Sequence, residues 1–262
     1  MKKKLIILTG PTAVGKTDLS IRLARTVGGE IISADSMQVY RRMDIGTAKI
    51  RPEEMDGVRH HLIDILEPTE SFNAFLFKEY ALKAANEIWE RGSIPIIVGG
   101  TGFYIQTLLY DIEFAKSDEN DGIRDELNKL YEEHGAAFLH DMLAKVDPEY
   151  AAEVHENNVK KVIRAIEFYR QTGHKLSEHN TEQRERTSPY NFEYFVLSDD
   201  RTVLYERIDK RIDGMVEAGL IAEVQALLDE GVDRRSVAMQ GLGYKEIASY
   251  LAGEISLDEA IY

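Results

Sequence analysis

The chain has 262 residues, with 46 acidic residues against 32 basic ones and a formal net charge of −14. This length can bury a sizeable core, so the fold does not need disulfides or metal staples. The chain has no cysteine, which excludes disulfides and thiolate metal sites. The acidic balance counts against a nucleic-acid partner, although net charge says nothing about how the basic residues are distributed.

The N-terminus lacks the pattern of a signal peptide. Three lysines, Lys2 to Lys4, precede an apolar stretch at residues 5–9, which is far too short for a secretory or membrane-spanning segment. We therefore expect a soluble cytoplasmic protein without a membrane partner.

The N-terminal part of the chain alternates between strand and helix patterns. Residues 4–8 are an apolar run ended by Gly-Pro, typical of a buried parallel strand. A helix is predicted over residues 18–27 and closed by two glycines, and a second strand follows at 30–34. Residues 79–91 favour a helix and residues 94–98 another buried strand. This alternation predicts an α/β fold with a doubly wound parallel sheet.

From about residue 114 the sequence becomes charged and helix-favouring, with predicted helices at 123–134 and 159–172. The next buried strand pattern, at residues 192–197, is expected to rejoin the sheet. Residues 201–228 and 244–262 again favour helices. We predict an α/β core made of residues 1–114 and 189–262, and a helical insertion of residues 115–188.

Residues 10–17 match the pattern G-x-x-x-x-G-K-[ST] in full, directly between a predicted strand and a predicted helix. This context disfavours a chance glycine-rich turn and predicts a P-loop NTPase-like core, as in nucleotide-binding and ATP-binding proteins. Backbone N–H groups would surround phosphate oxygens, Lys16 would neutralise them, and the Thr17 hydroxyl could bind Mg²⁺. The predicted phosphate site comprises Gly10, Pro11, Thr12, Ala13, Val14, Gly15, Lys16 and Thr17.

The P-loop alone does not say whether the ligand is a nucleotide or another diphosphate. An ATP or GTP hydrolase normally has a carboxylate on another strand, but the strand at 94–98 ends in Gly99-Gly100-Thr101. Asp35 instead follows the second strand, at the same edge of the sheet as the P-loop. It could hold Mg²⁺ through water or accept a proton from a nucleophile. The alternative is an N-cap for a helix that starts near Ser36.

A series of sequence blocks extends the P-loop pattern along the chain, at residues 34–40, 44–49, 60–64, 99–104, 164–167, 207–215 and 240–245. In order and spacing these blocks resemble the tRNA dimethylallyltransferases (isopentenyltransferases). The resemblance covers almost the whole chain. Each block alone would be weak evidence, but the series is specific.

The resemblance implies a prenyltransferase that moves the dimethylallyl group of dimethylallyl diphosphate to tRNA and releases diphosphate, with Mg²⁺ as cofactor. The acceptor would be the N6 amine of the adenine on the 3′ side of the anticodon, in the anticodon stem-loop. Asp35 would be the base that takes a proton from this amine. Lys16 and Arg211 would stabilise the departing diphosphate, and Thr17 would bind the metal. A monomer is expected.

The resemblance also implies a set of tRNA contacts, some of them in the insertion. They are Asp35, Ser36, Met37, Gln38, Thr101, Arg124, Lys160, Lys161, Val162, Ile163, Arg164, Gln240, Gly241, Leu242, Gly243, Tyr244 and Lys245. The three basic residues at 160, 161 and 164 recur at helical spacing, for which an ordinary solvated helix face is the alternative. The target base would have to be splayed out into a pocket.

The sequence departs from the family pattern in two places. Arg42 stands where the family usually has a glycine. The family also normally continues, beyond the point where this sequence ends, with a basic, aromatic helix that contacts tRNA.

Other interpretations of the same residues remain. A small-molecule or nucleotide kinase would use the same P-loop, with Asp35 activating a hydroxyl, and a non-catalytic RNA-binding or nucleotide-binding protein is a third possibility. Adjacent His60 and His61 would point in different directions, which favours structural roles over metal binding. Tyr40, Phe103 and Tyr104 could stack on a base or belong to the core, and we expect at least one of them in the core.

Overall fold

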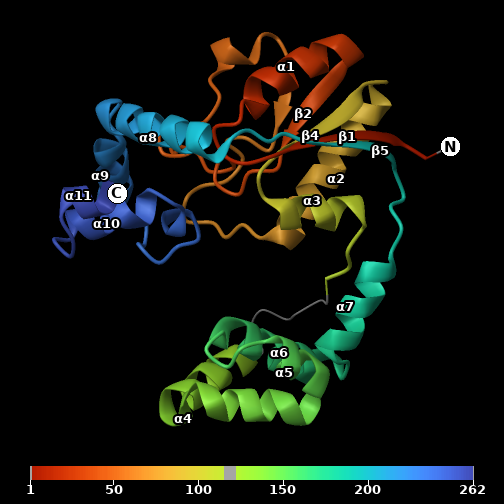
Figure 1. Cartoon of the computed structure of the whole chain (residues 1–262), viewed down its shortest axis with the longest axis vertical. Helices are drawn as coiled ribbons and strands as arrows, with labels where there is room; N and C mark the ends of the chain where they lie inside the picture. The colour runs from red at the N-terminus through yellow and green to blue at the C-terminus, as the bar shows by residue number, and fades with distance from the viewer. Residues whose placement is uncertain (1, 115–121, 262) are drawn as a thin grey trace. The chain divides into compact units, whose positions relative to one another are not determined.

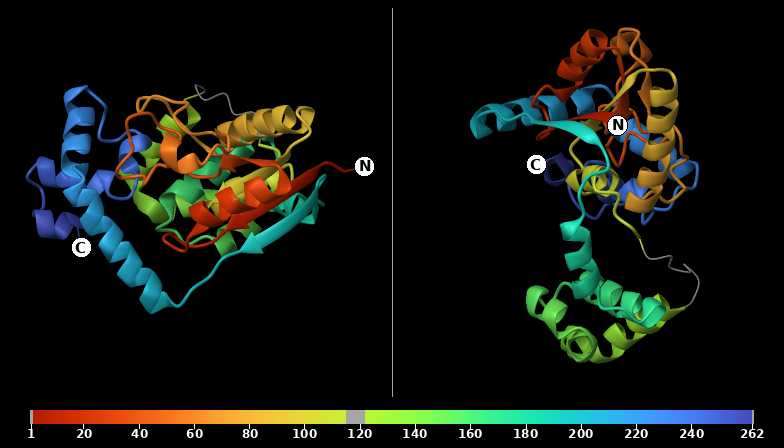
Figure 2. Two further views of the ribbon diagram at one scale, coloured as in Figure 1. Left: turned by 90° about the horizontal axis from the view of Figure 1, so that it is seen from above. Right: turned by 90° about the vertical axis from the view of Figure 1, so that its right-hand side faces the viewer.

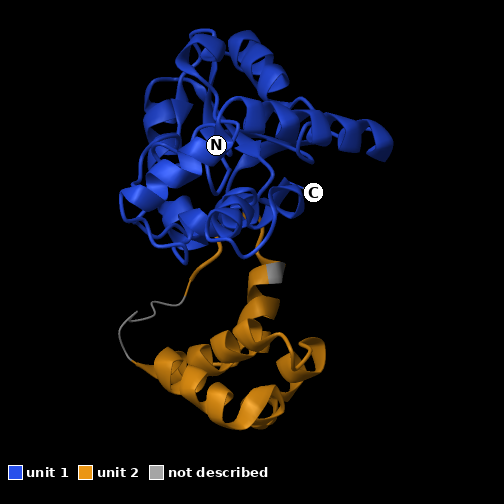
Figure 3. Ribbon diagram, turned by 90° about the vertical axis from the view of Figure 1, so that its left-hand side faces the viewer, with its two compact units in different colours: residues 1–109, 188–262 blue, residues 110–187 orange. Residues whose placement is uncertain are grey.

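A computed structural model describes residues 2–114 and 122–261 of the chain. Residues 1, 115–121 and 262 lie outside the described residues, and the first residues of the expected insertion are among them. The chain forms two compact units, one of residues 1–109 with 188–262 and one of residues 110–187 (Figure 3).

The first unit is built on a parallel sheet with the strand order β3-β2-β4-β1-β5 (Figure 1). Its strands are β1 (Lys4–Thr9), β2 (Gly29–Ser33), β3 (His60–His61), β4 (Ile94–Gly99) and β5 (Asn191–Val196). The predicted parallel α/β class is confirmed, and β5 rejoins the sheet beside β1. Strand β3 was not predicted from the sequence, because its two residues have no apolar run.

Helices cover both faces of this sheet (Figures 1 and 2). Helix α1 (Lys16–Val27) connects β1 to β2, whereas α2 (Ala74–Glu90) leads back from β3 to β4. Because the connections run in opposite directions and parallel crossovers are right-handed, the two helices lie on opposite faces. Helix α2 begins five residues before the predicted start, where the Asn73 side chain caps it by accepting from the Leu76 N–H at 3.0 Å. A short 3₁₀ helix, η1 (Pro52–Met55), precedes β3, and α3 (Gly102–Leu109) follows β4.

A layer of helices lies beyond the carboxyl ends of the strands (Figure 1). It contains α8 (Arg201–Glu217), α9 (Leu220–Asp229), the 3₁₀ helix η2 (Ala238–Gln240), α10 (Tyr244–Leu251) and α11 (Leu257–Ile261). The helical stretch predicted over 201–228 is divided at Gly219, whose φ of 105° is left-handed. This layer therefore faces the sheet edge at which open α/β sheets bind their ligands.

The second unit is helical and has its own apolar core. Its helices are α4 (Ile123–Val146), α5 (Pro148–Glu153), α6 (Val159–Thr172) and α7 (Leu176–Glu185). Leu127, Leu139 and Val162 are fully buried at its centre. Helix α4 is broken at Gly135, with a φ of 83°, so the helix predicted over 123–134 ends there and a second helical segment follows. Among the described residues of both units, no helix combines the length and apolar character needed to cross a membrane.

Gly99, at the end of β4, marks a close approach of two strands. A Cβ atom there would lie 2.3 Å from the Ala34 carbonyl oxygen. Gly99→Ala should therefore lower the free energy of unfolding by about 1–3 kcal/mol, the usual cost of overpacking. Denaturant unfolding measures this change.

Gly214→Ala is the matched control, because a Cβ at Gly214 in α8 would meet nothing within 4 Å. Alanine favours a helix over glycine, so this variant should gain up to about 1 kcal/mol. A Gly99→Ala protein as stable as the unsubstituted one would contradict the close approach.

Candidate active site

The loop between β1 and α1 has the backbone conformation of a phosphate cradle. Gly15, directly before α1, and Ala13 are both left-handed, with φ of 88° and 63°. A Cβ on Gly10 would lie 2.5 Å from the Leu197 carbonyl oxygen, so glycine is required there. The N–H groups at the start of α1 and the positive end of its dipole favour an anion in this loop.

Lys16 lies across this loop. Its Nζ donates to the carbonyl oxygens of Gly10 at 2.9 Å and Pro11 at 2.7 Å. Burial lowers the pKa of Lys16, the negative charge of Asp35 opposes this shift, and the positive charge of Arg211 adds to it. Asp35 and Arg211 are thus close enough to Lys16 to act on it electrostatically, although they come from distant parts of the sequence.

A cavity of about 780 Å³ extends from the P-loop to α8, α10 and α11. Its polar part includes Lys16, Thr17, Asp35 and Arg211. Its apolar part is lined by Ile208, Ile212, Met215, Val216, Leu220 and Ile247. The volume is that of a small-molecule site. The P-loop with Lys16 and Arg211, beside an apolar wall, suits a ligand with an anionic head and a hydrocarbon tail.

Asp35 closes a turn at the end of β2. Its Oδ1 accepts from the backbone N–H groups of Met37 at 2.8 Å and Gln38 at 3.2 Å. No helix starts near Ser36, and the residues that follow Asp35 form turns. The alternative of a helix N-cap is therefore wrong, because the carboxylate stabilises a turn and no helix, and it lines the cavity beside Lys16 and Thr17.

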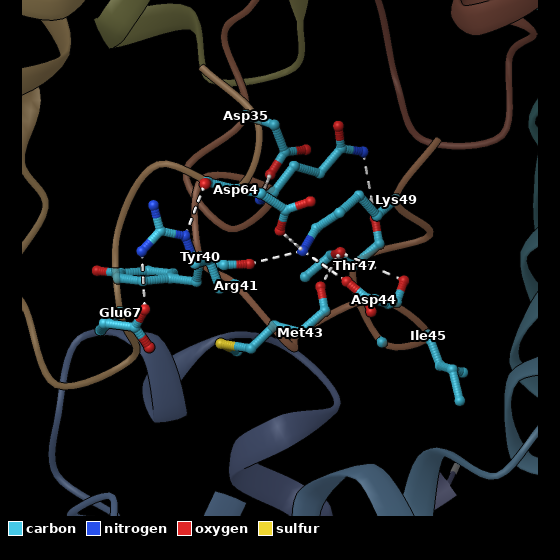
Figure 4. Close-up of polar contacts among 12 residues, drawn as sticks. Asp35, Tyr40, Arg41, Met43, Asp44, Ile45, Thr47, Lys49, Asp64 and Glu67 are labelled. Carbon is cyan, nitrogen blue, oxygen red and sulfur yellow. Dashed lines mark hydrogen bonds and ion pairs between the residues drawn. The ribbon is translucent and has the colours of Figure 1, made fainter. Parts of the chain in front are cut away.

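Lys49 fixes the long loop that follows Asp35 (Figure 4). Its Nζ donates to the Tyr40 carbonyl at 2.6 Å, to Asp44 at 2.6 Å and to Asp64 at 2.5 Å. The Lys49 side chain is only 4% exposed, whereas both carboxylates are largely exposed. A buried cation with three acceptors thus holds the loop together between Tyr40 and Asp64.

His60 and His61 make structural contacts. The His60 ring Nδ1 lies 2.9 Å from the Val58 carbonyl oxygen, and burial lowers the pKa of His60. The His61 Nε2 lies 2.8 Å from Glu30, whose pKa is lowered first by its hydrogen bonds with Arg91. In residues 2–114 and 122–261, no group of three or more His, Asp or Glu side chains could hold a metal ion.

The three candidate aromatic residues separate into core and surface. Tyr40 and Tyr104 are buried, and the Tyr104 ring stacks on Phe77 with centroids 4.8 Å apart. Burial raises the pKa of both tyrosines to about 12, and the Asp35 charge contributes at Tyr104. Phe103 is 55% exposed. The expectation that at least one of the three belongs to the core is confirmed.

Arg42 occupies a position that suits glycine. Its φ of 63° is left-handed, which accounts for the glycine in the family pattern. The Arg42 guanidinium pairs with Glu67 at 2.5 Å and with Glu230 at the end of α9.

In the second unit, the basic residues predicted to contact tRNA lie on the surface of α6. They are Lys160, Lys161 and Arg164, all exposed. Val162 and Ile163 are buried in the core of this unit, so their side chains support the helix beneath the exposed face. Arg124, in α4, is 58% exposed and pairs with Glu167 at 2.5 Å.

In the first unit, several of the predicted tRNA contacts meet at the cavity. Its lining includes Asp35, Met37, Gln38, Leu242, Gly243 and Tyr244. Among the described residues, Ser36, Thr101, Gln240, Gly241 and Lys245 are not part of this lining. Gly241 packs closely behind the lining residue Met37, because a Cβ at Gly241 would lie 2.3 Å from Met37 Cε. Leu242 is 89% exposed.

Glu223 was not among the predicted site residues, and the structure places it against the loop at residues 44–46. Its position on the apolar face of α9 could have indicated a specific role. Leu220, Val224 and Leu227 are buried, and Glu223 lies on the same helical face. A charged residue on an apolar stripe indicates a specific partner.

The sequence matches the family model described as IPP transferase over residues 38–262. It is 58% identical to the tRNA dimethylallyltransferase of Lachnoclostridium phytofermentans, a match that covers 98% of this chain and 82% of the relative. It is 50% identical to the tRNA dimethylallyltransferase of Carboxydothermus hydrogenoformans, with coverage of 100% and 84%. The chain therefore spans about four-fifths of the length of these relatives.

Solved structures agree with the sequence matches. A full-length tRNA isopentenylpyrophosphate transferase from Bacillus halodurans is similar with a TM-score of 0.72 and 47% identity, over 99% of this chain and 81% of that one. A eukaryotic dimethylallyltransferase acting on tRNA is similar with a TM-score of 0.85 and 32% identity, over 99% and 65%. Together with the site, these matches show that the chain belongs to the IPP transferase family.

Proposed function

We propose that this protein transfers the dimethylallyl group of dimethylallyl diphosphate to the N6 amine of the adenine on the 3′ side of the anticodon in tRNA. The observation that carries this proposal is the cavity that joins Lys16, Asp35 and Arg211 to an apolar wall. The names of the relatives favour this activity over a kinase.

At the donor end, the P-loop binds the diphosphate and the apolar wall receives the hydrocarbon. The amine nitrogen attacks C1 of the dimethylallyl group, the bond from C1 to oxygen breaks, and diphosphate leaves with the electron pair. Lys16 and Arg211 stabilise the negative charge that develops on this leaving group. Because an adenine amine is a weak nucleophile, stabilisation of the leaving group contributes more than basicity.

At the acceptor end, Asp35 takes the proton that the amine loses. Its Oδ1 is held by two backbone N–H groups, which orient the carboxylate at the cavity. Gln38, on the same turn, donates its Nε2 to the carbonyl oxygens of Thr47 and Ala48, which leaves its side-chain oxygen to accept from a base edge.

Mg²⁺ fits the donor end of the site. The cation prefers oxygen ligands and keeps several waters, so a single protein hydroxyl with substrate phosphates is sufficient. Thr17 would supply that hydroxyl. When bound, the ion would neutralise charge on the diphosphate.

The second unit contributes tRNA contacts through the exposed basic face of α6. Lys160, Lys161 and Arg164 would neutralise phosphates locally, which reconciles RNA binding with the acidic balance of the whole chain.

Incubation with radiolabelled dimethylallyl diphosphate, Mg²⁺ and unmodified tRNA tests the proposed function. Label should appear on N6 of one adenine, identified by mass spectrometry after nuclease digestion. A parallel incubation with ATP labelled at the γ-phosphate tests the kinase alternative. Phosphorylated product without prenylated tRNA would refute the proposal, and binding without any transfer would indicate a non-catalytic protein.

Lys16→Ala should slow transfer by about 10²-fold or more, because it removes a charge aimed at the leaving diphosphate. The fold should remain, as judged by melting curves. Arg25→Ala is the control, since Arg25 lies on the same helix in an exposed ion pair with Asp56. Undiminished transfer by Lys16→Ala would contradict the role of this lysine.

The variant Asp35→Asn distinguishes two roles of the Asp35 carboxylate, a base for the amine and a group that acts on the metal. If Asp35 is the base, the variant should bind the donor with near-normal affinity in Mg²⁺ and transfer about a hundredfold more slowly. Calorimetry and single-turnover transfer measure the two quantities. Strongly weakened donor binding, with a rate partly rescued by extra Mg²⁺, would show instead that Asp35 acts mainly on the metal.

Reversing the charges of Lys160, Lys161 and Arg164 should weaken tRNA binding and leave donor binding unchanged. The slope of log affinity against log salt should fall by about two, since each neutralised phosphate contributes about 0.7 to 0.9. Reversal of the charges of Lys129, Lys145 and Lys175, in the same unit, is the matched control. An unchanged slope would exclude this face of α6 as an RNA contact.

A further inference from the structure

Glu223, in α9, accepts from a run of successive backbone N–H groups. Its Oε2 lies 2.9 Å from the Asp44 nitrogen and 2.8 Å from the Ile45 nitrogen, and its Oε1 lies 3.2 Å from the Gly46 nitrogen. The Tyr244 hydroxyl of α10 donates to the same Oε1 at 2.5 Å. One carboxylate thus joins α9, α10 and the loop at residues 44–46.

This contact requires a carboxylate. All four partners are donors, and both carboxylate oxygens accept, whereas an amide of the same size has one accepting oxygen and a donating NH₂ group. Burial raises the pKa of Tyr244, and its bond to Glu223 adds to the shift, so the phenol keeps the proton that it donates.

Packing reinforces the same junction. A Cβ on Gly46 would lie 2.6 Å from the Tyr244 ring and 2.9 Å from Leu220 Cδ1, so the backbone of this loop lies directly against α9 and α10. Gly46, Tyr244 and Leu220 all line the cavity. The loop held by Glu223 is therefore part of the cavity wall.

The same loop reaches Asp35 through Gln38. The Gln38 side-chain Nε2 donates to the carbonyl oxygens of Thr47 at 3.3 Å and Ala48 at 3.4 Å. The Gln38 backbone N–H donates to Asp35 Oδ1. Figure 4 shows Asp35 beside the loop that carries Thr47 and Lys49. The position of residues 44–48 thus sets the position of the turn that holds the Asp35 carboxylate.

We propose that Glu223 is a positioning residue of the transfer reaction, which fixes the loop at residues 44–48 and so aims Asp35 and Gln38 at the acceptor base. The inference rests on the proposed function. Glu223 acts through the loop and leaves the diphosphate contacts of Lys16 and Arg211 unchanged. Its effect should fall on the transfer step and spare donor binding.

Glu223→Gln tests this inference, with Glu230→Gln as the matched control. Glu230 lies at the end of the same helix, and its substitution removes only an exposed contact with Arg42. Glu223→Gln should slow single-turnover transfer about tenfold or more, the scale of a small misplacement of reacting groups. The donor affinity of Glu223→Gln, measured by calorimetry, should stay within about twofold of that of the unsubstituted protein. The transfer rate and donor affinity of Glu230→Gln should both stay within the same range.

Backbone amide exchange gives a readout that does not depend on activity. In Glu223→Gln the N–H groups of residues 44–46 should exchange faster than in the unsubstituted protein, and in Glu230→Gln they should not. If Glu223→Gln does not fold, Tyr244→Phe removes one of the four donors, and a slower transfer with normal donor affinity is expected.

The outcomes separate the inference from the function on which it rests. An unsubstituted protein that transfers no prenyl group would refute the proposed function. An active unsubstituted protein whose Glu223→Gln and Tyr244→Phe variants transfer at its rate would overturn the positioning role. A rate loss matched by an equal loss of donor affinity, without faster exchange at residues 44–46, would also overturn it.

Discussion

The candidate site depends on the way in which the end of β4 is held between β1 and β2. The Thr9 hydroxyl donates to the Gly99 carbonyl at 2.9 Å on one side, and the Ala34 N–H donates to the Val98 carbonyl at 2.8 Å on the other. Gly99 has no side chain, so the backbone of Ala34 can approach it closely. The P-loop follows Thr9, and Asp35 follows Ala34. This junction therefore fixes the phosphate cradle and the carboxylate at one edge of the sheet.

The C-terminal helices complete a cavity at this edge. Helix α8 brings Arg211 and an apolar face to the P-loop, and α9 and α10 hold the loop that follows Asp35. The resulting cavity contains Lys16 and Arg211, which would stabilise the proposed leaving diphosphate, and an apolar wall that would shelter its hydrocarbon from water. The Asp35 carboxylate lines the same cavity. In the proposed mechanism, donor binding and proton removal are therefore carried out by different elements around one cavity.

Much of this arrangement could be predicted from local sequence. The pattern at residues 159–172 gave the bounds of α6, and the glycines after residue 27 marked the end of α1, because helix periodicity and caps are local properties. Strand β3 was missed because its two histidines have no apolar pattern and are held by pairing with β2. Glu223 was missed because three of its four partners lie 177 to 179 residues away. A contact between distant segments has no local signal, apart from a charge on an apolar helix face.

The most direct test of the account is a structure of the protein with a non-reactive thiolo analogue of dimethylallyl diphosphate and an unmodified anticodon stem-loop. The diphosphate should lie in the P-loop within hydrogen-bond distance of Lys16 Nζ. The hydrocarbon should lie against Ile212 and Met215, and the N6 amine of a splayed-out adenine should lie within hydrogen-bond distance of the Asp35 carboxylate. A diphosphate bound elsewhere, or an adenine amine that faces away from Asp35, would contradict the account.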